Sequence, residues 1–302
     1  MYLHTNRSLF EEIIEATAEK FGLSPAMIEK DYYVTMILKE LNQRCENVVF
    51  KGGTSLSKCY KIINRFSEDI DITFSEHIGE SRRKKLKYEV LGGLSKDLGM
   101  PIENWDRIRS KKNYNCYMFS YESVFSLDET LPTEIKLETA LASYAFPTET
   151  KEVDSYVYQF LVGRDTNLIE QYGMEVFKMK VQSLERTFVD KVFALCDYYL
   201  QDKSLRYSRH LYDIHKLNPH IEKNASLREL VREVRRHRQG MRICPSAERG
   251  VNIQKLVHRF CTEEFYKEDY LKVTEYYLAD NVSYDETINT ICRIVDAGFF
   301  DE

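Results

Sequence analysis

A short apolar run that ends in two glycines constrains the fold of this chain more than any other feature. Residues 48–50 (Val-Val-Phe) predict a strand, Gly52 and Gly53 predict a tight turn, and residues 56–63 have helical character. Glycines between a strand and a helix let the backbone approach a ligand, and the N-terminus of the helix offers free N–H groups to phosphate. An ordinary tight turn capped by a hydroxyl residue accounts for the same pattern, so the turn alone does not identify a phosphate site.

The next segment, residues 69–74, alternates between polar and apolar side chains and predicts a strand. Asp69 and Asp71 are two residues apart, so both carboxylates should project from one face of this strand. Their mutual repulsion is unfavourable unless cations lie between them, and Mg²⁺ prefers oxygen ligands of this kind. A solvent-facing edge strand is the alternative. With the glycine turn only a short helix upstream, the pattern favours a metal-binding pair.

The rest of the chain divides into a mixed α/β half and an all-helical half. Helical periodicity covers residues 8–41, with a restart at Ser24 and Pro25. The other predicted elements are a polar helix over residues 81–98, strands near residues 113–121, 134–141 and 175–181, and helices from residue 184 onward with turns near Pro219 and Pro245. We therefore expect an α+β (mixed α/β) fold with a small mixed sheet, in two domains of residues 1–182 and 183–302.

Composition excludes several classes of protein. The 302 residues are 43% hydrophobic, which is enough to build a core without disulfides, and the seven cysteines contain no Cys-x-x-Cys pair. The N-terminal residues lack the apolar region of a signal peptide, and no stretch reaches the roughly 18 apolar residues of a membrane span. We expect a soluble cytoplasmic protein with no membrane partner.

The net charge of −5 argues against bulk, non-specific binding of nucleic acid. Local basic patches remain possible, and two clusters could form them. The first comprises Arg107, Arg109, Lys111 and Lys112, and the second comprises Arg228, Arg232, Arg235, Arg236, Arg238 and Arg242. In the second cluster, spacings of three and four predict that residues 228, 232, 235 and 236 share one side of a helix. A solvated surface is the plainer interpretation of both clusters.

Several segments resemble those of a known family in their order and amino-acid sequence. They are Ile28-Glu29-Lys30-Asp31-Tyr32-Tyr33-Val34, Lys51 to Ile72, Ile135-Lys136-Leu137-Glu138, Ser183 to Lys191, and Arg209-His210-Leu211-Tyr212-Asp213-Ile214. Together they resemble the AbiEii/AbiGii-type toxins, including the MenT-like enzymes, within the DNA polymerase β nucleotidyltransferase superfamily. The resemblance covers residues 28–214, and residues 220–302 carry no matching motif.

The resemblance implies a role for each of these positions. Gly52, Gly53, Thr54, Ser55, Arg65 and Lys191 would bind the nucleotide, Asp69 and Asp71 would bind two Mg²⁺ ions, Lys191 would contact the triphosphate, Asp213 would complete the catalytic set, and Glu138 is the candidate third metal carboxylate. This chain has His210 before Leu-Tyr-Asp, where the family more often has an aspartate. A second carboxylate is therefore missing at that point.

Three of these assignments have alternatives that the sequence leaves open. Lys191 could be a surface lysine, although its largely apolar neighbours argue against that position. Asp213 could form an ion pair that fixes Lys191 instead of binding metal. Glu138 could form a salt bridge on an exposed face, because Lys136 should lie on the same face of its strand.

The resemblance implies a Mg²⁺-dependent nucleotidyltransferase toxin that moves a nucleoside monophosphate from an NTP to an acceptor. It implies a tRNA 3′ end as the acceptor and a cognate antitoxin as a partner, within a toxin–antitoxin or abortive-infection system. A protein hydroxyl or a small molecule is the alternative acceptor. A non-catalytic nucleotide-binding signalling module is the third possibility, but such a module has no need of two metal carboxylates.

Overall fold

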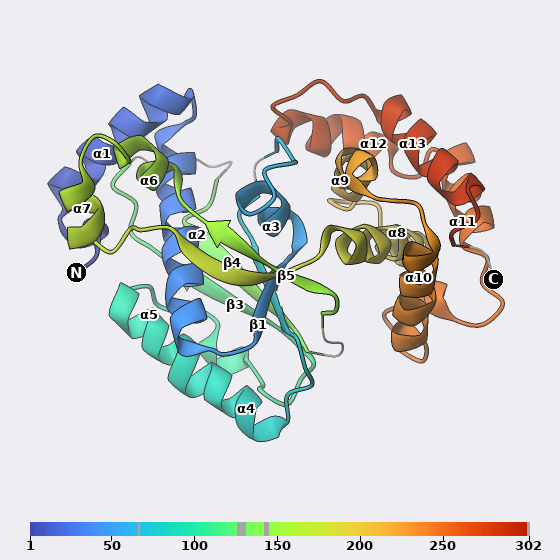
Figure 1. The fold of residues 1–302 in the computed structure, drawn as a ribbon, viewed down its shortest axis with the longest axis horizontal. Helices are drawn as coiled ribbons and strands as arrows, with labels where there is room; N and C mark the ends of the chain where they lie inside the picture. Colours follow the sequence, from blue (N-terminus) through green and yellow to red (C-terminus); the bar gives the residue numbers. More distant parts are fainter. Residues whose placement is uncertain (66, 126–130, 142–144, 301–302) are drawn as a thin grey trace. The chain divides into compact units, whose positions relative to one another are not determined.

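The structure of this chain, a computed structural model, describes residues 1–65, 67–125, 131–141 and 145–300 and forms two compact units (Figure 1). The first unit comprises Met1–Tyr60 and Ser67–Val181, and the second comprises Lys61–Phe66 and Gln182–Glu302. The sequence-based division into domains of residues 1–182 and 183–302 stays a prediction. The assignment of Lys61–Phe66 to the second unit has no counterpart in the sequence-based division, and it places Arg65 among the helices of that unit.

The first unit begins with two helices, as the sequence predicts. They are α1 (Arg7–Phe21) and α2 (Pro25–Arg44). Ser24 accepts a hydrogen bond from the Met27 N–H, and Pro25 occupies the first turn of α2, where its missing N–H costs nothing. Ile28, Ile37 and Leu41 are among the fully buried side chains by which α2 joins the core of this unit.

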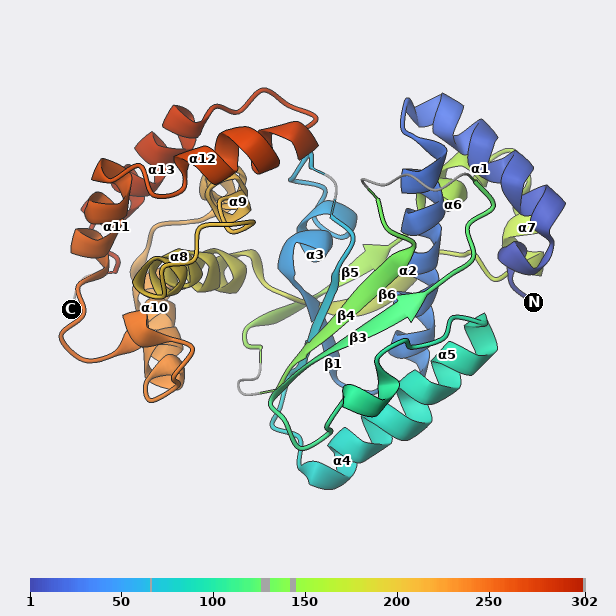
Figure 2. The ribbon, with the colours of Figure 1, turned by 180° about the vertical axis from the view of Figure 1, so that it is seen from behind.

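A six-stranded mixed sheet forms the centre of the first unit (Figures 1 and 2). Its strands are β1 (Val48–Lys51), β2 (Ile70–Phe74), β3 (Tyr114–Ser120), β4 (Glu134–Ala140), β5 (Thr148–Val153) and β6 (Phe177–Gln182). They lie in the order β3-β4-β2-β1-β6-β5. The pairs β1–β2 and β3–β4 are antiparallel, whereas β2–β4 and β1–β6 are parallel. This mixed pattern is the α+β fold expected from the sequence.

The two faces of the sheet differ in polarity. Ile70, Ile72, Ile135 and Leu137 are completely buried and join α1 and α2 in one apolar core. The alternate positions of β4 are half-buried and include Glu138. Because side chains alternate along a strand, the strands turn one face to the core and leave polar groups on the other.

The remaining elements of the first unit are helices and 3-10 turns. They are α3 (Gly52–Lys58), α4 (Glu80–Lys85), the π-helix η2 (Leu86–Leu91), α5 (Gly92–Leu98), α6 (Tyr156–Leu161), α7 (Thr166–Gln171) and the 3-10 turns η1 (Leu3–Thr5) and η3 (Trp105–Arg107). Helix α3 begins at the glycines and ends at Lys58, so the predicted helix over residues 56–63 was wrong at both ends. Strand β5, with α6 and α7, was not predicted, because β5 is polar and the two helices are six residues each.

The second unit is helical, as expected. It contains α8 (Leu184–Leu200), α9 (Arg209–Leu217), α10 (Ala225–Arg238), α11 (Ile253–Thr262), α12 (Lys267–Asp269) and α13 (Tyr284–Asp296), with short turns η4 (Asn218–His220), η5 (Pro245–Ala247), η6 (Tyr270–Thr274) and η7 (Glu275–Tyr277) between them. Ser183, Asn224, Asn252 and Ser283 cap the N-termini of α8, α10, α11 and α13. Within the described parts of the chain, no helix has the length and apolar character of a membrane span.

Candidate active site

The glycine turn of the first unit lies against one of the predicted metal carboxylates. Strand β1 ends at Lys51, α3 begins at Gly52, and Gly52 has a φ of 80°. An ideal Cβ at this position would lie 2.9 Å from Asp71 Cγ and closer still to its Oδ2. Residue 52 therefore must be glycine for two reasons: its left-handed backbone and the close approach of the Asp71 carboxylate.

The two hydroxyl residues after the glycines hold the turn together. Thr54 and Ser55 are both buried. Thr54 Oγ1 donates to the Asp69 carbonyl oxygen at 2.5 Å and lies 2.9 Å from Ser67 Oγ, while Ser55 Oγ donates to the Gly52 carbonyl oxygen at 2.9 Å. These hydroxyls are engaged with the protein, so the groups of this turn that are suited to phosphate are backbone N–H groups. No side chain caps α3 at Lys51.

Three carboxylates lie near this turn. Asp71 on β2 and Glu138 on β4 are paired residues of adjacent parallel strands. Asp69 lies one residue before β2, so it is outside the strand in which it was predicted. Burial, and then the negative charges of Asp71 and Asp69, raise the pKa of Glu138, although a hydrogen bond with Tyr114 acts in the opposite direction. Glu138 therefore lies near the charges of both aspartates.

The alternative of a salt bridge for Glu138 does not hold in this structure. The neighbouring Lys136 pairs with Glu134 at 3.6 Å. In the part of the chain that the structure describes, no salt bridge involves Asp69, Asp71 or Glu138, and no three acidic, histidine or cysteine side chains are grouped closely enough to enclose a metal on their own. Mg²⁺ keeps water and phosphate oxygens among its ligands, so two carboxylates meet its requirement. The donor chemistry thus fits a hard divalent cation.

The other predicted catalytic carboxylate, Asp213, lies in a different environment in the second unit. It is completely buried on α9, where Arg65 approaches it with Nε at 2.7 Å and Nη2 at 2.8 Å. Lys191 Nζ donates to the same carboxylate at 2.7 Å. Burial alone would raise the pKa of Asp213, but these two cations outweigh it and hold the pKa far below the ordinary value. Asp213 therefore forms an ion pair with Lys191, as one of the alternatives from the sequence expects, and its part in the reaction stays a prediction.

Lys191 belongs to the same buried network. It is 6% exposed on α8, which excludes a surface position, and its Nζ lies 3.3 Å from His210 Nδ1. Burial lowers the pKa of Lys191, as do Arg65 and Arg209, whereas Asp213 opposes this shift. Burial and the same cations lower the pKa of His210, so its neutral ring can accept a hydrogen bond from Lys191. His210, which stands where the family more often has an aspartate, thus contacts Lys191, the residue predicted to bind the triphosphate.

The segment Lys61–Phe66 brings Arg65 to this network. The Asn64 N–H donates to Tyr212 Oη at 2.9 Å, and Tyr212 Oη donates to Asp280 at 2.8 Å. A bridge between Arg65 and Leu278 fixes the segment further. The sequence assigned Arg65 to the nucleotide, but it did not indicate that Arg65 binds Asp213, because the two residues are 148 positions apart. It also missed Tyr114 as a partner of Glu138, for which no local pattern gives a signal.

A family profile described as "Nucleotidyl transferase AbiEii toxin, Type IV TA system" matches residues 37–281. The chain belongs to this family. AbiEii-family membership makes it a nucleotidyltransferase and a toxin of a type IV toxin–antitoxin system. A solved structure of MenT4, a nucleotidyltransferase toxin from Mycobacterium tuberculosis H37Rv, matches with a TM-score of 0.49 and 15% identity, covering 96% of this chain and 90% of that one. A comparison with curated proteins found no match.

The basic clusters of this AbiEii protein are arranged differently from the sequence expectation. On α10, Arg228, Arg232 and Arg236 are exposed, but Arg235 is buried and donates to the Val251 carbonyl oxygen. The prediction that Arg235 shares their side was wrong, because the apolar face of α10 includes residue 235. Arg238 also points inward, where it pairs with Asp190 and Asp197.

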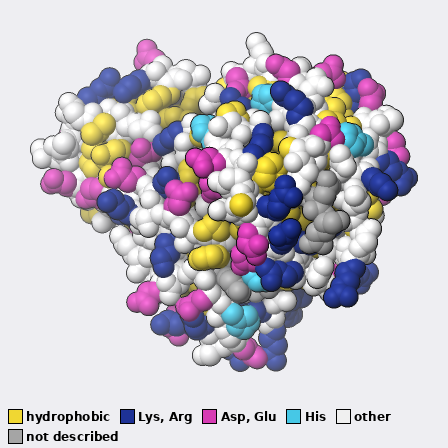
Figure 3. Space-filling model, turned by 45° about the vertical axis from the view of Figure 1, so that its right-hand side comes forward, with side chains coloured by type: hydrophobic (Ala, Val, Ile, Leu, Met, Phe, Trp, Pro, Cys, Tyr) yellow, Lys and Arg dark blue, Asp and Glu magenta, His cyan; other side chains and the backbone are white. Residues whose placement is uncertain are grey.

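The first cluster remains at the surface of its own unit. Arg107, Arg109, Lys111 and Lys112 are all exposed. On the face drawn in Figure 3, basic and acidic side chains are interspersed, in accord with the small net charge. Any attraction for nucleic acid must therefore come from local groups of arginine and lysine.

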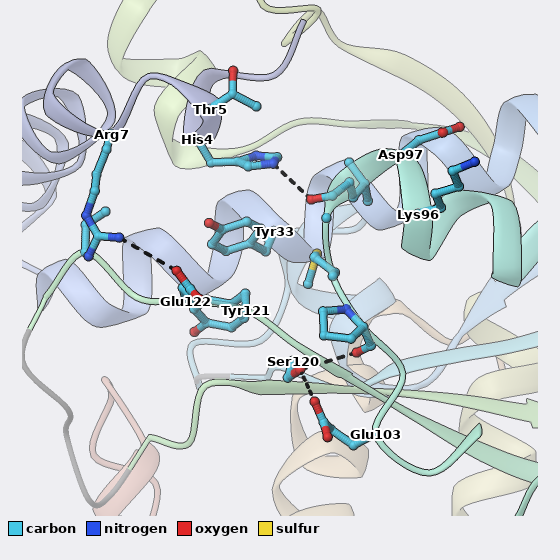
Figure 4. A pocket seen from close by; sticks show the side chains of 15 residues that line it. His4, Thr5, Arg7, Tyr33, Lys96, Asp97, Glu103, Ser120, Tyr121 and Glu122 are labelled. Carbon is cyan, nitrogen blue, oxygen red and sulfur yellow. Dashed lines mark hydrogen bonds and ion pairs between the residues drawn. The ribbon is translucent and has the colours of Figure 1, made fainter. Parts of the chain in front are cut away.

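The first unit also contains a cavity of about 580 Å³ (Figure 4). Tyr33 and Tyr121 stack in its wall with ring centroids 4.4 Å apart, and His4 Nε2 lies 3.1 Å from the Leu98 carbonyl oxygen. Glu103 accepts a hydrogen bond from Ser120. None of Asp69, Asp71 and Glu138 lines this cavity. Because these carboxylates are absent from its lining, we do not assign the transfer reaction to it.

Proposed function

We propose that this enzyme transfers a nucleoside monophosphate from a Mg²⁺-bound NTP to the 3′ end of tRNA. The observation that carries the proposal is the approach of the Asp71 carboxylate to the glycine turn, with Glu138 paired to Asp71 on the adjacent strand. A glycine turn at the start of a helix, beside a pair of carboxylates on adjacent strands, is suited to a phosphate chain that carries divalent cations. This combination favours an enzyme over a protein that only binds nucleotide.

The residues of the first unit would have distinct roles in binding the metal and the triphosphate. Asp69 and Asp71 would hold Mg²⁺, with Glu138 as a third carboxylate, and the backbone of Gly52 and Gly53 would approach the triphosphate. Divalent cations at such a site supply charge neutralisation at the reacting phosphorus and activate the attacking oxygen. The protein contributes position, because nucleotidyl transfer needs little covalent help from side chains.

In the second unit, Lys191 is the proposed contact for the triphosphate, and Arg65 is proposed to act through Asp213. Asp213 neutralises one of the two cations that bind it, so the network of Arg65, Lys191 and Asp213 keeps one net positive charge. A net positive group that is rigidly held by hydrogen bonds is suited to a phosphate.

The tRNA acceptor rests on the exposed arginines of α10. Arg228, Arg232 and Arg236 follow one another at intervals of four residues, and their nearest carboxylate partner, Glu229, lies 3.6 Å from Arg236 and 3.9 Å from Arg232. Exposed pairs at such distances are weak, so these arginines remain available to RNA phosphates. We further propose the cytoplasm, where tRNA is found, as the site of action and a cognate antitoxin as the partner.

The test is to incubate the purified chain with Mg²⁺, each labelled NTP in turn, and total cellular RNA and protein. We expect label from one preferred NTP at the 3′ end of tRNA, and none after addition of EDTA. Label in protein or in a small molecule would replace the acceptor and leave the chemistry intact. Nucleotide binding without transfer to any of these fractions would contradict the proposal as a whole.

A further inference from the structure

Two consecutive charged residues in the second turn of α2 have little or no exposed surface. Lys30 is completely buried, and the side chain of Asp31 is 11% exposed. Lysine is rarely buried in full unless it is paired. Lys30 Nζ donates to the Pro132 carbonyl oxygen at 2.7 Å and forms an ion pair with Glu68. Glu68 immediately precedes the predicted metal ligand Asp69.

The neighbouring Asp31 binds the helix that begins with the glycine turn. Its Oδ1 accepts a hydrogen bond from Lys58 Nζ, and its Oδ2 accepts one from the Tyr156 N–H at 3.0 Å. Lys58 is the last residue of α3 and also donates to the Asp154 carbonyl oxygen at 3.1 Å. Asp31 therefore fixes the C-terminal end of α3, whose N-terminal end is Gly52.

Asp69 needs such support more than Asp71 does. Asp71 lies inside β2, where backbone pairing with β1 and β4 sets its position, whereas β2 begins one residue after Asp69. The contacts that hold residues 67–69 are those of Thr54 with Ser67 and with the Asp69 carbonyl oxygen, and that of Lys30 with Glu68. When a group at a reaction site is displaced by about 1 Å, the rate of the reaction can fall by on the order of 10²-fold.

We propose that Lys30 and Asp31 are positioning residues for the transfer reaction, acting through Glu68 on Asp69 and through Lys58 on the glycine turn. The inference rests on the proposed function, because it requires Asp69 to be a metal ligand. Neither residue touches the substrate. Both act by fixing the two segments between which the metal-bound triphosphate would lie within the first unit.

The same helix offers a matched control. Lys39 donates to the Gly173 carbonyl oxygen at 2.7 Å and pairs with Glu175 at 2.8 Å, so its contacts are of the same types as those of Lys30. Its partners are in a different part of the unit, outside the segments that carry Gly52 and Asp69. Lys39→Met therefore removes an equivalent set of interactions from α2 without disturbing the proposed site.

The experiment measures Mn²⁺ binding in the presence of a non-hydrolysable NTP analogue, from the electron paramagnetic resonance signal of free Mn²⁺. We expect Lys30→Met to weaken Mn²⁺ binding by about tenfold, with a parallel loss in kcat and little change in KM for the NTP. Asp31→Asn should act on the other segment and weaken binding of the analogue itself. Lys39→Met should leave both affinities unchanged while lowering the melting temperature.

Glu68→Gln provides a second approach in case Lys30→Met does not fold. The glutamine side chain keeps nearly the same size and shape as glutamate, but the charge that pairs with Lys30 is lost, so we expect a smaller effect in the same direction. The double variant Lys30→Met/Glu68→Gln should bind Mn²⁺ no more weakly than the weaker-binding single variant, because Lys30 and Glu68 act as one unit.

Asp69→Asn separates this inference from the proposed function. If Asp69→Asn abolishes Mn²⁺ binding while Lys30→Met and Glu68→Gln both bind as wild type does, the positioning role is wrong and the metal site stands. If Asp69→Asn binds Mn²⁺ as wild type does, the metal role of Asp69 is wrong, and the inference built on it is overturned as well. An effect of Lys39→Met equal to that of Lys30→Met would reduce the role of Lys30 to general stability.

Discussion

The two units of this protein each contain buried or half-buried carboxylates, but they treat the charges in opposite ways. In the second unit, Arg65 and Lys191 surround Asp213 and lower its pKa. In the first unit, Glu138 lies near Asp71 and Asp69, and burial with their like charges raises its pKa. The charge of Asp213 in the second unit is balanced by cations of the protein itself. Among the described residues, the charges near Glu138 in the first unit are not balanced in this way. The comparison teaches that a functional site can be recognised by the charge it leaves uncompensated.

The largest effect should come from removing a carboxylate of the first unit. Asp69→Asn or Asp71→Asn should lower the transfer rate by on the order of 10³ or more, because a proposed metal ligand is removed. The melting temperature in EDTA should hold or rise, since repulsion among the acids decreases. Loss of activity together with unfolding would show instead that these acids are structural.

The next effect concerns the cation in the second unit. Lys191→Met should lower kcat/KM for the NTP by about 10²-fold, because a charge proposed to contact the triphosphate is removed. Lys191→Arg should restore only part of this, since a planar guanidinium does not replace a compact ammonium. Wild-type kinetics in Lys191→Met would remove the triphosphate contact from our proposal.

Asp213→Asn should affect stability above all. It leaves Arg65 and Lys191 buried against each other, and breaking a buried ion pair of this kind typically costs about 3–5 kcal/mol of unfolding free energy. Because the folded-state pKa of Asp213 is lowered, its contribution is present above the ordinary value of 3.8 and is lost as the pH falls below it. Denaturant unfolding at pH 7 and pH 3 should therefore show a smaller difference between variant and wild type at pH 3.

Glu138→Gln should give the opposite pH dependence. The pKa of Glu138 is raised, so the folded state favours its protonated form, and the wild type loses stability as the pH rises from the ordinary value of 4.5 through the raised pKa. The glutamine variant should not lose this stability. Melting curves in EDTA between pH 4 and pH 8 measure the difference, which added Mg²⁺ should reduce by stabilising the wild type. A constant offset at all pH values would contradict the assignment.

The smallest effect should come from the surface of α10. Reversal of Arg228, Arg232 and Arg236 to glutamate should weaken tRNA modification and lower the slope of affinity against salt by about one unit for each arginine that binds a phosphate in the wild type. Mg²⁺-NTP binding should not change. Lys255→Glu with Arg259→Glu, on the exposed side of α11, is the control. An equal loss in the control would indicate non-specific attraction and not a defined RNA surface.

Much of the fold was accessible from the sequence because local patterns determine it. The restart at Ser24 and Pro25, the strand-glycine-helix order and the alternation in β2, β3 and β4 each follow from residues close together in the chain. Strand β5 was missed because a polar strand carries no apolar period, and its position beside β6 depends on residues far away.

The sequence by itself predicted which residues would carry the chemistry: two glycines, two aspartates at a spacing of two, and a lysine among apolar neighbours. Only the tertiary structure decided how these groups are paired. Arg65 joins Asp213 because a six-residue segment of the chain folds into the second unit, and Lys30 reaches Glu68 across 38 residues of sequence. Local patterns report the backbone of a residue and its immediate neighbours. Charge compensation depends instead on groups brought together by packing, and this is why Asp213 is neutralised by two cations in one unit while Glu138 lies near like charges in the other.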